Sequence, residues 1–214
     1  SYVLFTLTQA ELGRLLLPLG DLPKERIRQL AAEAGLPVAD KPDSQEICFI
    51  PDGDYRTFVA ERHKPRPGKL VDTSGTLLGQ HPGIHFFTVG QRKGLGLNGN
   101  TGTPRYVVRI DAETNKVVLG REEELYRSVF WASGVSYTAG EPPEGPIEVN
   151  AKIRYKASES AATVVPHVGW AEVRFEKPQR AVTPGQAVVF YDGEEVVGGG
   201  MIELNPPARA SNAA

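Results

Sequence analysis

Cysteine is almost absent from this chain of 214 residues, which contains Cys48 alone. A single thiol cannot close an internal disulfide, and it cannot supply the several thiolates of a typical structural zinc site. Long apolar runs are also missing. A typical apolar run is Ala187–Tyr191, which is far shorter than the roughly 20 residues of a membrane-spanning helix.

The first residues, from Ser1 to Thr6, lack the basic region, the apolar core and the small-residue cleavage site of a secretory signal. With no candidate membrane span either, the sequence favours a cytoplasmic protein without a membrane partner.

Neither sign of charge dominates, because 24 basic and 26 acidic side chains give a formal net charge of −2. The overall charge therefore does not indicate a polyanionic partner. The segment from Arg56 to Lys93 differs, since it holds seven basic and two acidic side chains. This local excess can follow the phosphates of a nucleic acid or can simply form a solvated charged face, and composition leaves both interpretations open.

Residues 1–47 are expected to be helical. A threonine and a glutamate in capping-box spacing, followed by leucines at helical spacing, predict a helix from about Thr8 to Leu17. A second helix is predicted to begin near Pro23 and to stop at Gly35. Two short amphipathic helices cannot enclose a core, so this segment is interpreted as the tail of a domain whose main part lies upstream.

Past Cys48, short apolar segments separated by glycine and proline predict a small central domain, mostly of β-structure, over residues 48–125. One short helix is allowed around Phe58. The predicted strands are Lys69 to Asp72, His85 to Val89, Tyr106 to Asp111 and Lys116 to Leu119. The last two strands are joined by a short polar turn and are expected to form a hairpin.

Residues 126–205 show the period-two pattern of strands with one buried face, most strictly from Ile147 to Tyr155. Further apolar segments follow at roughly ten-residue spacing and predict a small antiparallel β-barrel. These segments are Ala162 to Val165, Ala171 to Phe175, Gln186 to Tyr191 and Glu195 to Val197. Residues 206–214 are expected to be a frayed tail. The predicted fold class is therefore mostly β, with a short α-helical N-terminal segment.

Two motifs that suggest bound groups are rejected on their context. Gly94 to Gly99 fits the GxGxxG fingerprint of dinucleotide sites, but the residues that follow, Asn100 to Pro104, do not begin the helix that such a site requires. His81 and His85 have the spacing of two imidazoles on one helix face, but a proline and a glycine stand between them. No metal site is predicted.

Cys48 is the remaining chemical candidate. A cysteine between an isoleucine and a phenylalanine can be a small buried apolar residue or a nucleophile. Its place at the junction of the helical segment and the β-domain favours a substrate cleft, because ligands often bind between domains. The residues alone leave both interpretations open.

The segment from Lys41 to Ile50, KPDSQEICFI, resembles the second-cysteine motif of the tRNA-specific 2-thiouridylases, the MnmA family. Four further matches follow in the same order along the chain. They are Gly79–His81 with Thr88–Gly96, then Lys152–Tyr155, Thr183–Gln186 and Gly198–Gly200. Together these matches span nearly the whole sequence.

The resemblance implies a sulfurtransferase that replaces the C2 oxygen of the wobble uridine of tRNA with sulfur. In the family, an N-terminal domain with a pyrophosphatase-type loop uses ATP to activate the uridine, and a desulfurase or sulfur-relay protein supplies persulfide sulfur. Cys48 matches the family cysteine that carries the persulfide. In the family, an earlier cysteine then forms a disulfide with this cysteine and so resolves the persulfide. The nucleotide-binding domain is not matched here, so the chain is expected to be the carboxy-terminal portion of such an enzyme.

The resemblance also assigns contacts with tRNA to three residues, Arg154, Tyr155 and Gln186. A guanidinium pairs with phosphate and a tyrosine ring stacks on a base, which suits the first two. The alternative for Tyr155 is a place in the barrel core. Three residues of the glycine-rich loop are further candidates for tRNA contact: Gln91, Arg92 and Lys93.

A second class of function stays open, namely a non-catalytic RNA-binding module in which Cys48 is structural. The reactivity of the thiol would separate the two. The predicted barrel also resembles the second domain of translation elongation factors, which is an analogy of fold and does not indicate function.

Overall fold

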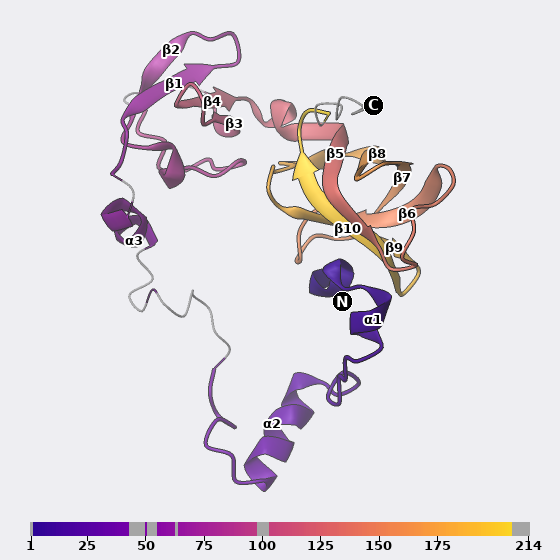
Figure 1. Cartoon of the computed structure of the whole chain (residues 1–214). Helices are drawn as coiled ribbons and strands as arrows, with labels where there is room; N and C mark the ends of the chain where they lie inside the picture. Colours follow the sequence, from indigo (N-terminus) through magenta and orange to yellow (C-terminus); the bar gives the residue numbers. More distant parts are fainter. Residues whose placement is uncertain (1, 43–49, 51–54, 63, 98–102, 207–214) are drawn as a thin grey trace. The chain divides into compact units, whose positions relative to one another are not determined.

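The structure, a computed structural model, describes residues 2–42, 50, 55–62, 64–97 and 103–206 (Figure 1). Cys48 lies outside the described residues. The described part of the chain divides into two compact units, one within Gly13–Lys64 and the other within Ser1–Leu12 and Pro65–Ala214.

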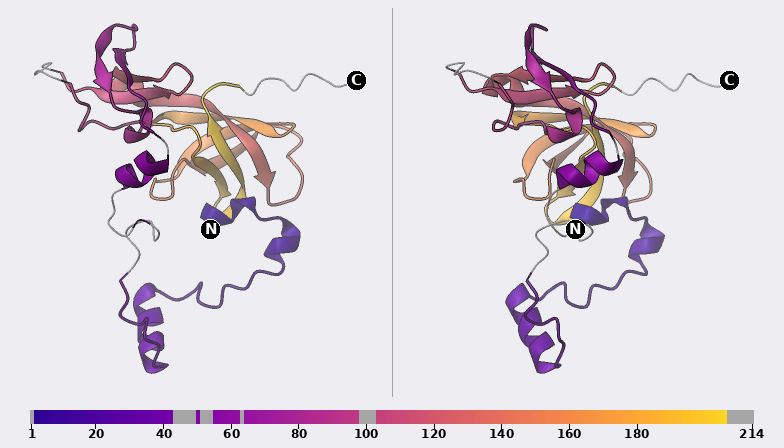
Figure 2. Two further views of the ribbon diagram at one scale, coloured as in Figure 1. Left: turned by 60° about the vertical axis from the view of Figure 1, so that its left-hand side comes forward. Right: turned by 90° about the vertical axis from the view of Figure 1, so that its left-hand side faces the viewer.

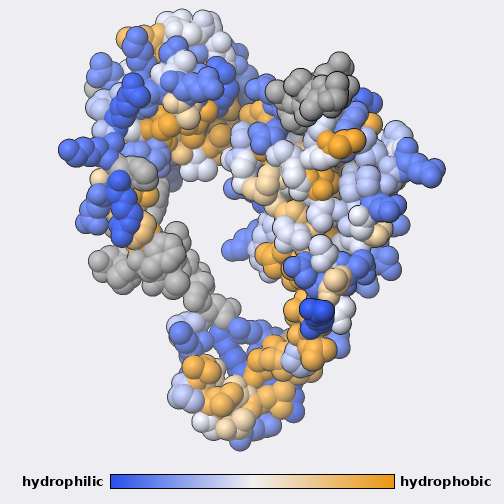
Figure 3. Space-filling model, in the orientation of Figure 1, coloured by the Kyte–Doolittle hydropathy of each residue, from blue (hydrophilic) through white to orange (hydrophobic). Residues whose placement is uncertain are grey.

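The unit within Gly13–Lys64 contains two helices, α2 (Lys24–Glu33) and α3 (Tyr55–Arg62). The prediction for α2 is confirmed: Pro23 precedes its first residue, and Gly35 adopts a left-handed φ of 67° just after its end. No residue of α2 is buried, and Leu16 is 85% exposed. Figure 3 shows apolar residues gathered on the surface of this unit. Many of its leucines are therefore exposed and are not packed into a core of the unit.

The predicted helix from Thr8 to Leu17 is much shorter in the structure, where α1 covers Gln9–Leu12. The capping box itself forms, because the Thr8 amide donates to Glu11 Oε2 at 2.8 Å and the Glu11 amide approaches Thr8 Oγ1 at 3.4 Å. A glycine follows Leu12 directly, and Pro18 disfavours helical geometry in the residue before it. The leucine spacing therefore overstated the length of the helix.

The N-terminal residues pack against the barrel of the second unit. The 3₁₀ turn η1 (Tyr2–Thr6) buries Phe5 against Val189 and Tyr191, and the Tyr2 hydroxyl donates to the Ala187 carbonyl at 2.7 Å. Figure 2 shows this indigo segment against the end of the barrel. The start of the chain is therefore part of the barrel unit.

The central sheet has four strands in the order β2-β1-β4-β3. They are β1 (Gly68–Asp72), β2 (Leu77–His81), β3 (Tyr106–Asp111) and β4 (Lys116–Gly120). The β3–β4 hairpin is confirmed, and β1 joins it by pairing in parallel with β4. The core of the central sheet consists of six buried apolar side chains: Leu70, Phe87, Leu95, Val107, Val117 and Leu119.

One central strand was predicted wrongly and one was missed. The segment from His85 to Val89 is not a strand, because the amides of Phe86 and Phe87 bond locally within the 3₁₀ turn η2 (Ile84–Phe86). The missed strand β2 lies at the edge of the sheet and fully buries only His81. An edge strand with so little burial leaves almost no alternation in the sequence.

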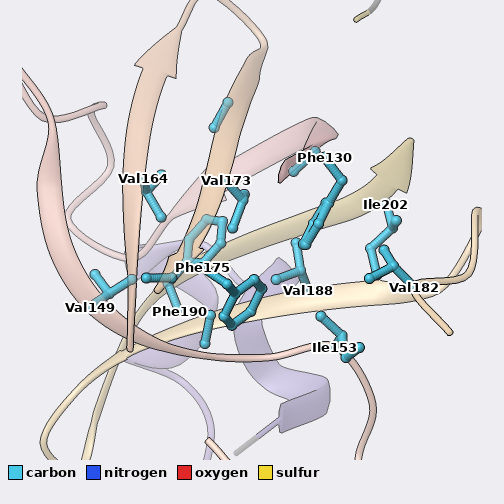
Figure 4. Close-up of a cluster of buried hydrophobic side chains, with 14 residues drawn as sticks. Phe130, Val149, Ile153, Val164, Val173, Phe175, Val182, Val188, Phe190 and Ile202 are labelled. Carbon is cyan, nitrogen blue, oxygen red and sulfur yellow. The ribbon is translucent and has the colours of Figure 1, made fainter. Parts of the chain in front are cut away.

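The C-terminal sheet closes into a six-stranded barrel in the order β10-β5-β8-β7-β6-β9, and all neighbours are antiparallel. Its strands are β5 (Tyr126–Tyr137), β6 (Ile147–Lys152), β7 (Ser160–His167), β8 (Trp170–Arg180), β9 (Ala187–Asp192) and β10 (Glu195–Glu203). Aromatic and β-branched side chains such as Phe130, Val164 and Phe190 fill its interior (Figure 4). The predicted fold class is confirmed.

The long strand β5 was not predicted. Its register shifts between Arg127 and Val129, and Gly134 has a left-handed φ of 56°, so its side chains do not alternate regularly. Strand β6 in turn ends earlier than the alternation suggests. The chain turns after Lys152, where the Ala157 amide donates to the Arg154 carbonyl at 3.1 Å.

The three glycines of β10 let this strand pass closely between β5 and β9. A Cβ on Gly198 would lie 2.4 Å from the Ser136 carbonyl oxygen, and one on Gly199 would lie 2.6 Å from both the Val188 carbonyl oxygen and the Phe5 ring. These distances are shorter than any normal contact of a methyl group. The glycines of the Gly198–Gly200 match are therefore required on steric grounds, because neighbouring strands of the closed barrel leave no room for a side chain there.

We predict that Gly199→Ala destabilises the chain by about 1–3 kcal/mol, because the new methyl group must displace backbone of β9 and the Phe5 ring. Chemical denaturation measures the loss. The matched control is Gly145→Ala, at a position where an added Cβ meets nothing within 4 Å. Equal stability of the two variants would contradict this account of the close approach.

His81 is a buried titratable side chain within the central sheet. It is 3% exposed, and neither ring nitrogen has a hydrogen-bond partner of good geometry among the described residues. Burial lowers the pKa of His81 below its ordinary value of 6.5, and the nearby His85 acts in the same direction, while the backbone of Asn115 opposes them. The folded chain therefore disfavours the protonated ring.

The lowered pKa of His81 means that the unfolded chain binds this proton more readily than the folded chain. Its contribution to stability is complete above about pH 6.5 and is lost as the pH falls below that value. We predict that His81→Leu reduces the loss of stability between about pH 7.5 and 5.5, measured by urea denaturation at both pH values. A variant with an unchanged loss would show that other groups set this pH dependence.

Candidate functional site at the junction of sheet and barrel

The carbonyl of Ala181, just past the end of β8, accepts hydrogen bonds from two of the family-like motifs. The Arg154 guanidinium donates to it through Nη2, and the Thr183 hydroxyl donates to it at 2.9 Å. Ala181 is 1% exposed and has a left-handed φ of 54°. A carbonyl oxygen has two lone pairs, so it can satisfy both donors at once.

A third family-like motif reaches the same residue from the central sheet. Gly90 has a φ of 89°, and a Cβ there would lie 3.1 Å from the Cβ of Ala181. The Gly90 amide donates to the Val107 carbonyl at 2.7 Å, and the Val107 amide donates back to the Gln91 carbonyl at 2.9 Å. The Ala181 amide completes the junction by donating to the Leu125 carbonyl at 2.8 Å.

The glycine-rich loop is held by the side chain of Gln91. Its Oε1 accepts from the Thr88 amide at 3.0 Å, and its Nε2 donates to the Lys93 carbonyl at 2.9 Å. The following Leu95 is buried in the core of the central sheet. Among the three loop candidates, Arg92 and Lys93 are exposed, whereas the amide of Gln91 is occupied within the loop.

Tyr155 is 70% exposed and lies edge-on to the ring of Tyr2, with 6.1 Å between the ring centroids. The alternative that Tyr155 completes the barrel core is therefore wrong. Gln186 is also exposed, at the end of a tight turn in which Gly185 has a φ of 77°. The turn is fixed to β10, because the Gln186 carbonyl accepts from the Ile202 amide at 2.8 Å.

A hollow of about 300 Å³ lies where the central sheet meets the barrel. It is lined by Phe87, Thr88, Val89, Arg109, Ile110, Thr183, Pro184 and Leu204. Two of the motifs that meet near Ala181 therefore also contribute to its wall. Its lining is mostly apolar, with one guanidinium and two hydroxyl-bearing residues.

Within the described part of the chain, no group of three or more histidine, cysteine, aspartate or glutamate side chains is placed to hold a metal ion. In the same residues, no helix is long and apolar enough to span a membrane. The role of Ala181 was not found from the sequence, because an alanine whose backbone carbonyl is the functional group leaves no signal in a pattern of side chains.

Three family models match the chain. The model described as the tRNA methyl transferase HUP domain matches residues 1–52, and the tRNA methyl transferase PRC-barrel domain matches residues 56–121. The aminomethyltransferase beta-barrel domain matches residues 127–202.

Among curated proteins, the chain is similar to enzymes named tRNA-specific 2-thiouridylase MnmA. It is 52% identical to that of Moorella thermoacetica over 207 residues, and 46% identical to that of Halothermothrix orenii over 208 residues. These alignments cover 95% and 96% of this chain but 57% and 58% of the relatives. The chain thus spans just over half the length of these relatives, and it belongs to the family of tRNA-specific 2-thiouridylases, the MnmA family.

Proposed function

We propose that this chain forms the carboxy-terminal part of a tRNA 2-sulfurtransferase, which replaces the C2 oxygen of the wobble uridine with sulfur. One observation carries the proposal. Three segments that resemble the family, far apart from one another in the sequence, meet at the buried Ala181: Arg154 and Thr183 bond its carbonyl, and Gly90 lies so close that an added Cβ would be 3.1 Å from the Ala181 Cβ. The names of the relatives support the same activity.

The descriptions of two domain models name methyl transfer, but the residues of this chain favour sulfur chemistry. Cys48 stands in a segment that resembles the persulfide-carrying motif of the family. A thiolate attacks the outer sulfur of a donor persulfide, forms a new S–S bond at Cys48 and releases the donor thiolate. The terminal sulfur bound to Cys48 is then the nucleophile for C2 of the uridine, and the ATP-activated C2 oxygen leaves as AMP. The earlier cysteine of the family motif then attacks the Cys48 sulfur, so that a disulfide forms and the outer sulfur stays on C2.

The glycine-rich motif of this chain does not fit an ATP site. The glycine-rich segment near Gly94 is followed, where the structure describes the chain again, by an extended segment and strand β3 rather than by a phosphate-binding helix. We therefore assign ATP-dependent activation of the uridine to the region of the relatives that this chain does not match. The sulfur donor is proposed to be a desulfurase or a sulfur-relay protein.

Contacts with tRNA are assigned to Arg154, Tyr155 and Gln186, with Arg92 and Lys93 as further contacts. The exposure of Tyr155 and Gln186 supports this assignment, since both can reach a ligand without rearrangement. A guanidinium has five N–H donors, so Arg154 can bond the Ala181 carbonyl and still pair with a phosphate. We further propose that residues 1–47, 48–125 and 126–205 are the functional divisions of the chain.

The role of Cys48 is tested in a chimera in which this chain replaces the matching 57% of the Moorella thermoacetica relative. Incubated with tRNA, ATP, a cysteine desulfurase and cysteine, the chimera should produce 2-thiouridine, detected by mass spectrometry. We expect Cys48→Ser to abolish the product and to prevent labelling by ³⁵S-cysteine, because a hydroxyl cannot carry sulfane sulfur. Binding of tRNA to the variant should be unchanged.

If the Cys48→Ser chimera thiolates tRNA as well as the parental chimera does, the carrier assignment is refuted. A parental chimera that binds tRNA but never thiolates it, with an active Moorella enzyme as the control, would favour the alternative of a non-catalytic RNA-binding module.

The phosphate contact of Arg154 is tested with Arg154→Ala and Arg154→Lys in the same chimera. We expect the alanine variant to bind tRNA about tenfold more weakly and to reduce the slope of log affinity against log salt by about one. The lysine variant should keep the salt slope, since it keeps the charge. If the alanine variant keeps the parental affinity and salt slope, Arg154 makes no phosphate contact and serves only through its bond to the Ala181 carbonyl.

A further inference from the structure

A second, strongly basic hollow lies at one end of the central sheet. Its volume is about 380 Å³, and it is lined by Arg66, Pro67, Gly68, Lys69, Gln80, Thr114, Asn115 and Lys116. None of these residues belongs to the motifs that meet near Ala181, except Gln80 from the short Gly79–His81 match. The lining contains three cations and two side-chain amides, and it contains no carboxylate.

Strand register places two of the cations side by side. Lys69 on β1 is the partner of Gln80 on β2 and of Lys116 on β4. Directly paired residues point to the same face of a sheet, so these three side chains form one row. Two like charges opposite each other destabilise a sheet, and such an arrangement is expected where an anion binds between them.

The backbone that carries the third cation, Arg66, is held by Asn115. The Asn115 side-chain amide donates to the Arg66 carbonyl at 3.2 Å and to the Pro67 carbonyl at 2.8 Å, and its backbone carbonyl accepts from the Lys69 amide at 3.4 Å. Asn115 holds a left-handed φ of 53°, a conformation that asparagine tolerates better than most residues. The β3–β4 turn therefore orders the segment that carries Arg66.

Among the described residues, none of the three cations lies within ion-pair distance of a carboxylate. The nearest acid in the row is Asp111, the register partner of Lys116. Its pKa is lowered first by hydrogen bonds from Thr114, whose amide lies 3.0 Å from Asp111 Oδ1, and then by the charges of Arg109 and Lys116. One carboxylate offsets at most one of the three cations, so the hollow keeps a net positive charge.

We propose that this hollow binds the phosphodiester backbone of tRNA, an inference that rests on the proposed function. Lysine and arginine supply the positive charge that phosphate oxygens require, and the Gln80 amide can bond a ribose hydroxyl. A site of this kind positions the RNA without reading its sequence. It adds a contact on the central sheet to those assigned to the barrel.

The test compares the chain with its Lys69→Ala, Lys116→Ala double variant by filter binding of tRNA at several chloride concentrations. Removing two phosphate contacts should reduce the salt slope by about two, so that between about 50 and 200 mM salt the variant loses about tenfold less affinity than the parent. Two tRNAs of different sequence should be affected equally. The double variant should melt no lower than the parent, because repulsion between two lysines is removed.

The matched control is Lys69→Arg, Lys116→Arg, which keeps both charges and should retain the slope of the parent. If the alanine variant keeps the parental slope, the inference is overturned although tRNA binding by the chain stands. If the parent itself binds no tRNA, the proposed function fails and this inference fails with it. If the alanine variant loses affinity for inorganic phosphate but not for tRNA, the site binds a free anion and the inference is again wrong.

Discussion

The backbone of Ala181 is the point on which the arrangement of the barrel unit depends. Its carbonyl accepts from Arg154 and Thr183, its amide donates to the Leu125 carbonyl, and its methyl group would lie 3.1 Å from a Cβ added at Gly90. The hydrogen bond from a partly buried guanidinium to a carbonyl is stronger than a hydrogen bond between two neutral groups. Leaving either group without a partner would destabilise the fold. The loops that we assign to tRNA are thus positioned by one residue of the framework.

This arrangement links the two sheets of the unit to one another. The central sheet contributes Tyr106, and the barrel side contributes Ala181 at the end of β8, in a shared buried cluster that also includes Leu125. Arg180 adds an ion pair with Glu122 at 3.4 Å across the same region. Loops held at both ends by packed strands keep their geometry better than free loops, and this geometry is a requirement for recognising a folded RNA.

Sequence patterns predicted the strands that are marked by a clear apolar segment and flanking turns, and missed strands in which that pattern is irregular. The β3–β4 pair was predicted from two apolar segments joined by a short polar turn, and the start of β6 was predicted from its period-two pattern; all three strands were placed correctly. Strand β2 at the sheet edge and the bulged β5 lack that regularity. For the candidate site, side-chain chemistry pointed to Arg154 and Tyr155, but it could not show that Gln91 is occupied within its own loop or that a backbone carbonyl joins the motifs.

The seating of η1 on the barrel has a consequence for the order in which the unit folds. The Tyr2 hydroxyl and its acceptor, the Ala187 carbonyl, are 185 residues apart in the sequence, and Phe5 is buried against Val189 and Tyr191 of the same strand. Contacts between residues so distant form slowly, because the entropy of closing the chain between them is lost before the contact stabilises it. During synthesis, which proceeds from the N-terminal side, the contacts of Phe5 with β9 therefore cannot form until β9 has been made. The first turn of this chain is among the last parts of the barrel unit to reach its final contacts.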